Sequence, residues 1–152
     1  VSALRPYDCY NIDMSDHQNP DKVAPRKVLI VEDETFISEL YVRALGTGNY
    51  TVEAIADGEK ALAEAQKNEY DIILLDLMVP NLSGIEILRA LRDPARVPPI
   101  KAKIIITTNL EQRDEVRADI EKQADGYVVK AELTPHELVA FLDKINSPKL
   151  AR

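Results

Sequence analysis

The sequence predicts an α/β fold in which a five-stranded parallel sheet carries helices on both faces. Short apolar runs alternate five times with longer stretches whose apolar residues recur at helical spacing. This alternation is typical of a parallel sheet, because parallel neighbours need a long crossover that a helix supplies. Apolar residues make up 45% of the 152-residue chain, which is enough for a core. No run reaches the ~20 apolar residues of a membrane span, so we expect no membrane insertion.

The first part of the pattern contains two strands and two helices. Val28–Val31 is a short apolar run, as expected for a strand buried on both faces. Apolar residues of Ile37–Leu45 share one helical face, and Gly46 follows as a helix stop. Thr51–Ile55 is then predicted to be a strand, and Glu59–Lys67 a helix.

The middle of the chain is more strongly apolar. Asp71–Asp76 contains four consecutive apolar residues and is predicted to be the third strand. A loop containing Pro80 follows, and Ile85–Leu91 has helical spacing. Three prolines at positions 94, 98 and 99 break that helix before the fourth strand at Ile104–Ile106.

The last part repeats the alternation. Val116 and Ile120 indicate the fourth helix, and Tyr127–Val129 is predicted to be the fifth strand. The apolar residues of Leu138–Ile145 line a fifth helix. Thr134 is expected to cap it, with a proline following in the first turn.

The composition changes at about residue 26. Residues 1–25 mix proline, asparagine and aspartate with scattered apolar residues and are predicted to be a flexible extension. Residues 26–146 form the expected domain, and 147–152 a short tail. The single cysteine, Cys9, favours a reducing, cytoplasmic setting. The formal charge of −7 argues against direct nucleic-acid binding, which needs clustered cations.

Polar residues follow the predicted strands at the points where they end. In an open parallel sheet, ligands bind outside the carboxyl ends of the strands, so these residues should meet at one edge. Taken singly, each has an ordinary interpretation as a turn, strand or helix-start residue. They are Glu32 and Asp33 after the first strand, Asp76 at the third, Thr107 and Thr108 at the fourth, and Lys130 at the fifth.

Three carboxylates at one edge would repel each other unless a cation joined them. Oxygen ligands of this kind suit Mg²⁺. A carboxylate can attack a phosphoryl group and form an aspartyl phosphate. A lysine could add positive charge on the side opposite the cation, and a threonine hydroxyl could donate to a phosphoryl oxygen.

The segment Lys27–Ile145 resembles the receiver domain of two-component response regulators, including the single-domain chemotaxis regulator. Single motifs are weak, but their order and spacing cover nearly the whole domain. The matching stretches are Val31-Glu32-Asp33-Glu34, Leu75-Asp76-Leu77-Met78-Val79-Pro80 with Gly84, Ile106-Thr107-Thr108-Asn109, and Ala124-Asp125-Gly126-Tyr127-Val128-Val129-Lys130.

The resemblance implies a flavodoxin-like strand order of 2-1-3-4-5 and a role for each site residue. It also implies a signalling phosphoacceptor that catalyses only its own phosphorylation and dephosphorylation, rather than a conventional enzyme. The implied roles are Asp76 as phosphoacceptor, Asp33 as direct metal ligand, Glu32 as ion-site ligand through water, the Met78 carbonyl as a further ligand, Lys130 and Thr108 as phosphoryl contacts, and Tyr127 with Thr108 as switch residues.

The implied partners are a histidine kinase or histidine phosphotransfer protein and an output protein. The output protein would bind the face made by the fourth helix, fifth strand and fifth helix, and a phosphorylation-dependent homodimer fits the same family. Leu110 and Met78, each two positions after a site residue, predict a long-lived phosphorylated state.

The sequence departs from the family where Ala131 replaces the usual proline after Lys130. A cis bond there would cost roughly 3 kcal/mol without proline, so the usual loop geometry is not expected to follow directly. Asn109 replaces a small residue after the switch threonine, where it can alter access to the pocket.

Three other functions compete with this interpretation. A haloacid-dehalogenase-type hydrolase needs a second acid where Met78 stands. A flavin-binding relative needs a phosphate loop where Glu32 and Asp33 would repel phosphate. A receiver-like interaction module that works without phosphorylation remains an alternative.

Overall fold

The computed structural model describes residues 23–109 and 113–146, so most of the predicted extension and the whole predicted tail lie outside it. Its five strands are parallel and follow the order β2-β1-β3-β4-β5, which confirms the expected fold class. The strands are β1 (Arg26–Val31), β2 (Tyr50–Ile55), β3 (Ile72–Asp76), β4 (Lys103–Thr108) and β5 (Gly126–Val129).

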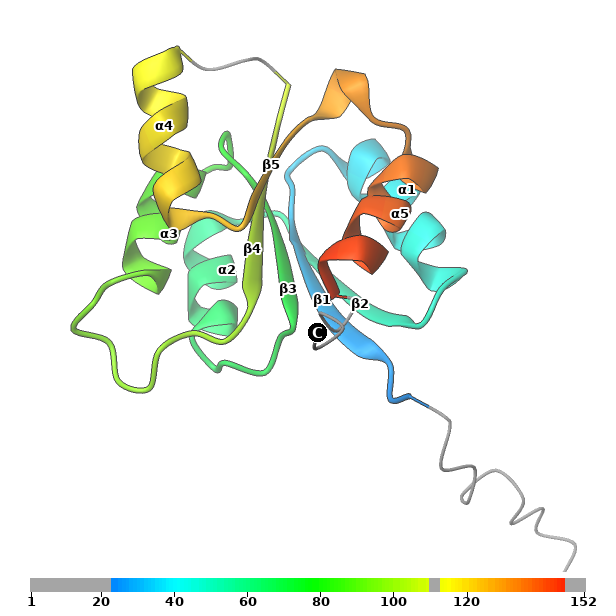
Figure 1. Ribbon diagram of the computed structural model, residues 1–152, viewed down its shortest axis with the longest axis horizontal. Coiled ribbons are helices and arrows are strands. Elements are labelled where there is room, and N and C mark those ends of the chain that lie inside the picture. Colours follow the sequence, from blue (N-terminus) through cyan, green and yellow to red (C-terminus); the bar gives the residue numbers. More distant parts are fainter. Residues whose placement is uncertain (1–22, 110–112, 147–152) are drawn as a thin grey trace, which may run out of the picture.

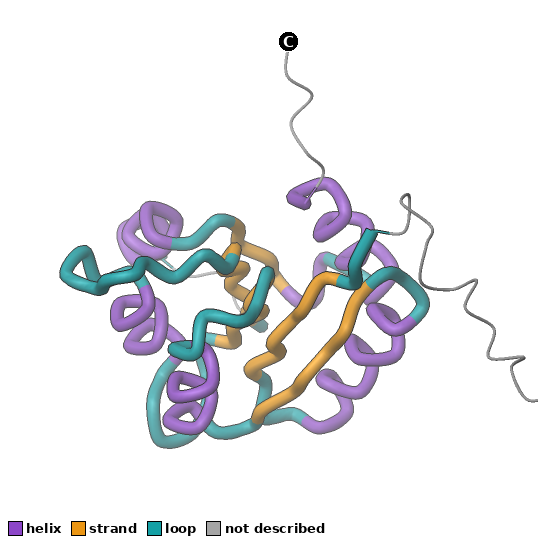
Figure 2. The backbone as a smooth tube through the Cα atoms, turned by 90° about the horizontal axis from the view of Figure 1, so that it is seen from below, coloured by secondary structure: helices purple, strands orange, loops and turns teal. Residues whose placement is uncertain are grey.

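The helices lie on both faces of the sheet. α1 and α5 cover one face, and α2, α3 and α4 cover the other (Figure 1). Figure 2 shows the strands from below, between these two groups of helices. The helices are α1 (Thr35–Gly46), α2 (Gly58–Ala65), α3 (Gly84–Leu91), α4 (Asp114–Gln123) and α5 (Pro135–Asn146).

The central strands divide the core into two clusters. Successive side chains of a strand point to opposite faces, so Leu29 packs with α2 and α3 while Ile30 packs with α1 and α5. All five residues of β3 are buried. Complete burial of each large aliphatic side chain contributes roughly 1.5–3 kcal/mol to stability. The buried strands β1 and β3 therefore hold the residues at their carboxyl ends in fixed positions.

Side-chain hydrogen bonds cap the first turns of α5 and α3. The Thr134 hydroxyl accepts a hydrogen bond from the Glu137 amide at 3.2 Å, and the Glu137 carboxylate accepts one from the Thr134 amide at 2.7 Å. This reciprocal pair confirms Thr134 as the cap of α5. Ser83 and Glu86 form the same arrangement at the start of α3.

One connection differs from expectation, and the structure defines a second that the sequence left open. α2 ends at Ala65, two residues before the predicted end, and a turn follows in which Asn68 has a φ of 58°. After β5, Lys130–Glu132 forms a short 3₁₀ helix. Within the described ranges, the cis peptide bond is at Val97–Pro98, so the Lys130–Ala131 bond is trans.

None of the helices in the described part of the chain is both long and apolar enough to span a bilayer.

Candidate functional site

Sheet register brings the predicted acids together. Val31 of β1 lies opposite Leu75 of β3, so the next residues along each strand, Glu32 and Asp76, become neighbours. Asp76 in turn lies opposite Thr107 of β4. The carboxyl ends of parallel strands therefore place residues 44 positions apart at one edge, as the sequence predicted.

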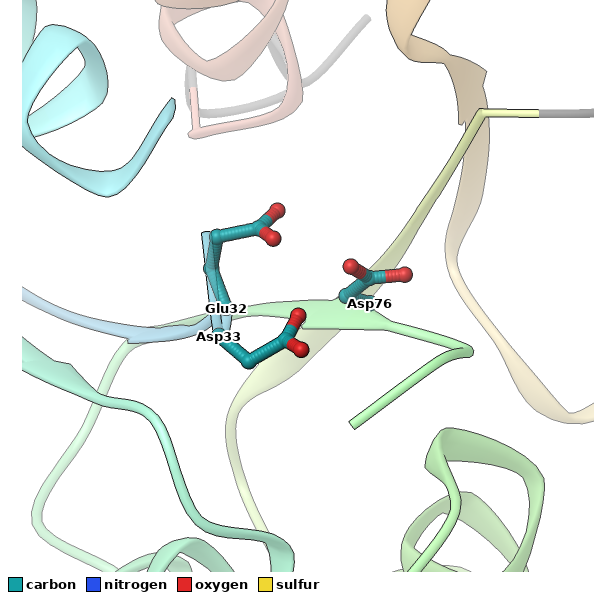
Figure 3. Close-up of side chains that lie close together, drawn as sticks. All are labelled: Glu32, Asp33 and Asp76. Carbon is teal, nitrogen blue, oxygen red and sulfur yellow. The ribbon is translucent and has the colours of Figure 1, made fainter. Parts of the chain in front are cut away.

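Three carboxylates converge at this edge. Oxygen atoms of Glu32, Asp33 and Asp76 lie within 4.8 Å of one another. Figure 3 shows Glu32 and Asp33 on one side and Asp76 facing them. Glu32 and Asp76 are each only 3% exposed, whereas Asp33 faces solvent. The cluster thus has a buried floor and one open, acidic side through which a cation can enter.

Hydrogen bonds orient the Asp76 carboxylate. Its Oδ1 accepts from the Met78 amide at 3.0 Å, and its Oδ2 accepts from the Lys130 ammonium at 2.8 Å. One donor on each oxygen fixes the plane of the group. The Met78 side chain points outward and is 77% exposed, so its backbone is the part of that residue close to the acid.

Lys130 lies between two acids, and the sequence did not anticipate this contact. Its ammonium hydrogen-bonds Glu32 as well as Asp76, and the side chains of all three are at most 5% exposed. The sequence had placed Lys130 on the far side of a phosphoryl group. In the structure its charge balances two buried carboxylates, because burial makes an unpaired carboxylate costly. Its role as a phosphoryl contact stays a prediction.

Burial also shifts the pKa values in this cluster. Desolvation raises the pKa of Glu32 to about 7, although the hydrogen bond from Lys130 opposes that shift. Desolvation alone would lower the pKa of Lys130, but its hydrogen bonds to Asp76 and Glu32 outweigh this and raise it. Lys130 is therefore a permanent cation near neutral pH, and Glu32 can exchange a proton there.

The remaining predicted residues occupy the expected elements. Thr108 ends β4 and is 2% exposed. Tyr127 lies in β5 and is half-buried, with the Arg117 guanidinium of α4 4.8 Å from its ring centre. No sequence pattern indicates that stacking contact. The proposed roles of Thr108 and Tyr127 stay predictions.

Asn109 also lies close to the site. Its amide donates to Glu34 at 3.3 Å, which joins the end of β4 to the loop after β1. The expected effect of Asn109 on access to the pocket stays a prediction. Leu110, the other residue predicted to border it, lies outside the described residues.

The donor set fits a hard divalent cation. All its atoms are oxygens, and one of the three acids is open to solvent, which suits an ion that keeps several waters. Carboxylate, ammonium and hydroxyl groups at one sheet edge are also what phosphoryl transfer to an aspartate requires.

Comparisons with known proteins identify the family and the fold. The family model for the response regulator receiver domain matches residues 28–143. This chain therefore belongs to the response regulator receiver domain family, which is a signalling domain rather than a conventional enzyme.

Its relatives include larger regulators. The response regulator ArlR of Staphylococcus saprophyticus is 39% identical over 121 residues, covering 80% of this chain and 51% of ArlR. The transcriptional regulatory protein ResD of Bacillus subtilis is 34% identical over 119 residues, covering 78% of this chain and 47% of ResD. The chain thus spans about half the length of these relatives.

Solved structures show the same fold. The chemotaxis response regulator CheY4 of Vibrio cholerae superposes with a TM-score of 0.68 at 30% identity, covering 80% of this chain and 99% of that one. A LuxR-family DNA-binding response regulator from Staphylococcus aureus gives a TM-score of 0.70 at 23% identity, with 80% and 99% coverage.

Proposed function

We propose that this chain accepts a phosphoryl group on Asp76 from a histidine kinase or histidine phosphotransfer protein. The single observation that carries the proposal is the buried, doubly hydrogen-bonded Asp76 carboxylate facing Glu32 and Asp33. Asp33, Asp76 and the Met78 carbonyl would hold Mg²⁺, with Glu32 acting through water. When bound, Mg²⁺ supplies charge neutralisation on the transferring oxygens.

The reaction forms one bond and breaks another. An Asp76 oxygen attacks phosphorus, the P–N bond of phosphohistidine breaks, and its electron pair stays on the histidine nitrogen. Met78 and Lys130 hold the nucleophile in one orientation, which removes part of the entropic barrier. Thr108 would donate a hydrogen bond to a phosphoryl oxygen, and the resulting contact would bias the α4-β5-α5 face toward a partner-binding form.

Exposed apolar side chains support a protein phosphodonor. Phe36, three residues after Asp33, is 71% exposed, and Met78, two after Asp76, is 77% exposed. Each follows an acid of the site closely along the chain, and we propose that both side chains contact the protein donor. The net charge of −7 supports protein partners rather than direct nucleic-acid binding, and the lone cysteine supports a cytoplasmic setting.

Intact-mass analysis after treatment with acetyl phosphate and Mg²⁺ tests the acceptor. Wild type should gain one phosphoryl group, and Asp76→Asn should gain none. The matched control Asp93→Asn removes a carboxylate from the loop after α3 and should behave as wild type. An unmodified wild type would favour the interaction module that works without phosphorylation, and phosphorylated Asp76→Asn would rule out this acceptor.

Phosphotransfer from a panel of histidine kinases tests the donor. Phe36→Ser should slow transfer from the cognate kinase while acetyl phosphate still modifies Asp76 at the wild-type rate, because the small donor needs no docking surface. Equal kinase rates for both proteins would remove Phe36 from the docking surface.

A further inference from the structure

The loop between β3 and α3, residues 77–83, connects the acceptor strand to the next helix and is held at both ends. At its start, the Met78 amide donates to Asp76. At its end, the Gly84 amide donates to the Leu77 carbonyl at 3.0 Å, and a Cβ on Gly84 would lie 2.2 Å from the Asp76 carbonyl oxygen. The backbone conformation at both ends of the loop is therefore set by contacts with the strand and helix that it joins.

The middle of the loop is held by a different segment, the connection between β2 and α2. The Gly58 amide donates to the Pro80 carbonyl at 3.0 Å. A Cβ on Gly58 would lie 2.1 Å from the Leu82 carbonyl oxygen, so only glycine permits this approach. The two loops thus pack backbone against backbone.

One pair of side chains closes this contact. Asn81 has a φ of 71°, and its amide donates to Asp57 Oδ2. The other Asp57 oxygen accepts from the Lys60 amide at 2.9 Å and caps α2. A single carboxylate therefore joins the start of α2 to the loop that follows the acceptor.

We propose that Asp57 and Asn81 are positioning residues, which hold the β3–α3 loop so that the Met78 carbonyl can bind the cation beside Asp76. This inference rests on the proposed function for the identity of the metal site. Asn81 is only three residues from Met78, and its left-handed backbone sets the direction in which the loop turns. Without the cross-link, that loop would sample more conformations, and cation binding would have to order it.

A matched pair of asparagines tests the inference. Asn81→Gly tolerates the positive φ but removes the amide. Asn68→Gly is the control, because Asn68 also has a positive φ and its side chain also bridges two loops, donating to the Pro99 carbonyl at 3.1 Å and accepting from the Lys101 amide at 2.9 Å. Asn68 lies before β3, at the opposite end of the sheet from the acids.

Isothermal titration with Mg²⁺ alone should show a dissociation constant about 2- to 12-fold higher for Asn81→Gly, as expected for one lost hydrogen bond. Asn68→Gly should bind Mg²⁺ as wild type does, although urea unfolding without Mg²⁺ should show that this variant too is destabilised. Wild-type Mg²⁺ affinity in Asn81→Gly, or equal weakening in both variants, would overturn the positioning role.

Asp57→Ser gives a second route if Asn81→Gly folds poorly. Serine can still cap α2, but it offers no second oxygen to Asn81. It should weaken Mg²⁺ binding by the same factor, and the double variant should be no weaker than either single one. Additive losses would mean that the two residues act separately and would overturn the proposal.

Asp33→Ala distinguishes failure of this inference from failure of the proposed function. If Asp33→Ala loses Mg²⁺ binding while Asn81→Gly keeps it, the metal site stands and the positioning role fails. If Asp33→Ala binds Mg²⁺ as wild type does, the site itself is wrong and both proposals fail.

Discussion

Replacing Lys130 with methionine would leave two buried carboxylates without their cation. Methionine keeps much of the length and apolar stem of lysine, so the change removes mainly the charge and its hydrogen bonds. Lys130, Glu32 and Asp76 are at most 5% exposed at their side chains, so water cannot take over these contacts without rearrangement. Breaking a buried ion pair from one side typically costs about 3–5 kcal/mol, and we expect a loss in that range at pH 8 without Mg²⁺.

The loss should depend on pH in a defined direction. Burial raises the pKa of Glu32 to about 7, and Lys130 acts against that rise. Removing Lys130 therefore moves this pKa further up. An acid whose pKa is higher in the folded state than in the unfolded chain binds its proton more tightly when folded. Its contribution to stability is therefore present at low pH and is lost as pH rises through the folded-state pKa. The variant should lose less stability at pH 5.5 than at pH 8.

Urea unfolding at both pH values, with and without Mg²⁺, measures these effects. Mg²⁺ should stabilise Lys130→Met more than wild type, because the ion supplies the missing positive charge. Lys103→Met is the control, since Lys103 is half-exposed and lies 3.9 Å from Asp125, and it should change stability by less than about 0.5 kcal/mol. A loss below about 1 kcal/mol at pH 8, or equal Mg²⁺ stabilisation of both proteins, would refute this reasoning.

Three further predictions concern Arg92, the pair Met78 and Leu110, and Glu137. The Arg92 guanidinium donates to three backbone carbonyl oxygens and one carboxylate, so Arg92→Met should lower the free energy of unfolding by about 2–3 kcal/mol in urea titration; a loss below about 0.5 kcal/mol would contradict it. Met78→Asn/Leu110→Glu should speed loss of the phosphoryl group about tenfold in a direct rate comparison, because polar side chains can orient the attacking water; an unchanged rate would end this account. Hydrogen bonds from the backbone and hydroxyl of Thr134 hold the pKa of Glu137 below its ordinary value of 4.5. The Tm difference between wild type and Glu137→Gln should therefore be present above about pH 4.5 and vanish as pH falls through the folded-state pKa; a constant difference down to pH 2 would contradict it.

Much of the fold follows from local sequence. The apolar runs give the five strands and the helical spacings give the five helices, because both patterns reflect which faces must be buried. Thr134 indicates where α5 begins. A hydroxyl followed three residues later by a glutamate can accept hydrogen bonds from backbone amides that have no partner at the start of a helix. The order of strand-end residues also predicted that Glu32, Asp33 and Asp76 would meet.

Tertiary structure alone decided which groups contact each other within that edge. Lys130 pairs with Glu32 across 98 positions and with Asp76 across 54. A lysine side chain can reach several partners from one backbone position, so the local pattern does not select among them. The choice depends on the depth at which the neighbouring carboxylates are buried.

The contact between the loops at Asp57 and Asn81 was also decided by tertiary structure. Each segment alone predicts a turn or a helix start, and neither indicates that the other lies alongside. Their contact exists because β1 lies between β2 and β3 in the sheet and α2 packs beside α3, which brings the two loops to the same edge. Local propensity determines the conformation of each segment. Only the packed sheet determines which loops lie close enough to form hydrogen bonds, because the donor and acceptor atoms must be about 3 Å apart in space, whatever their separation in the sequence.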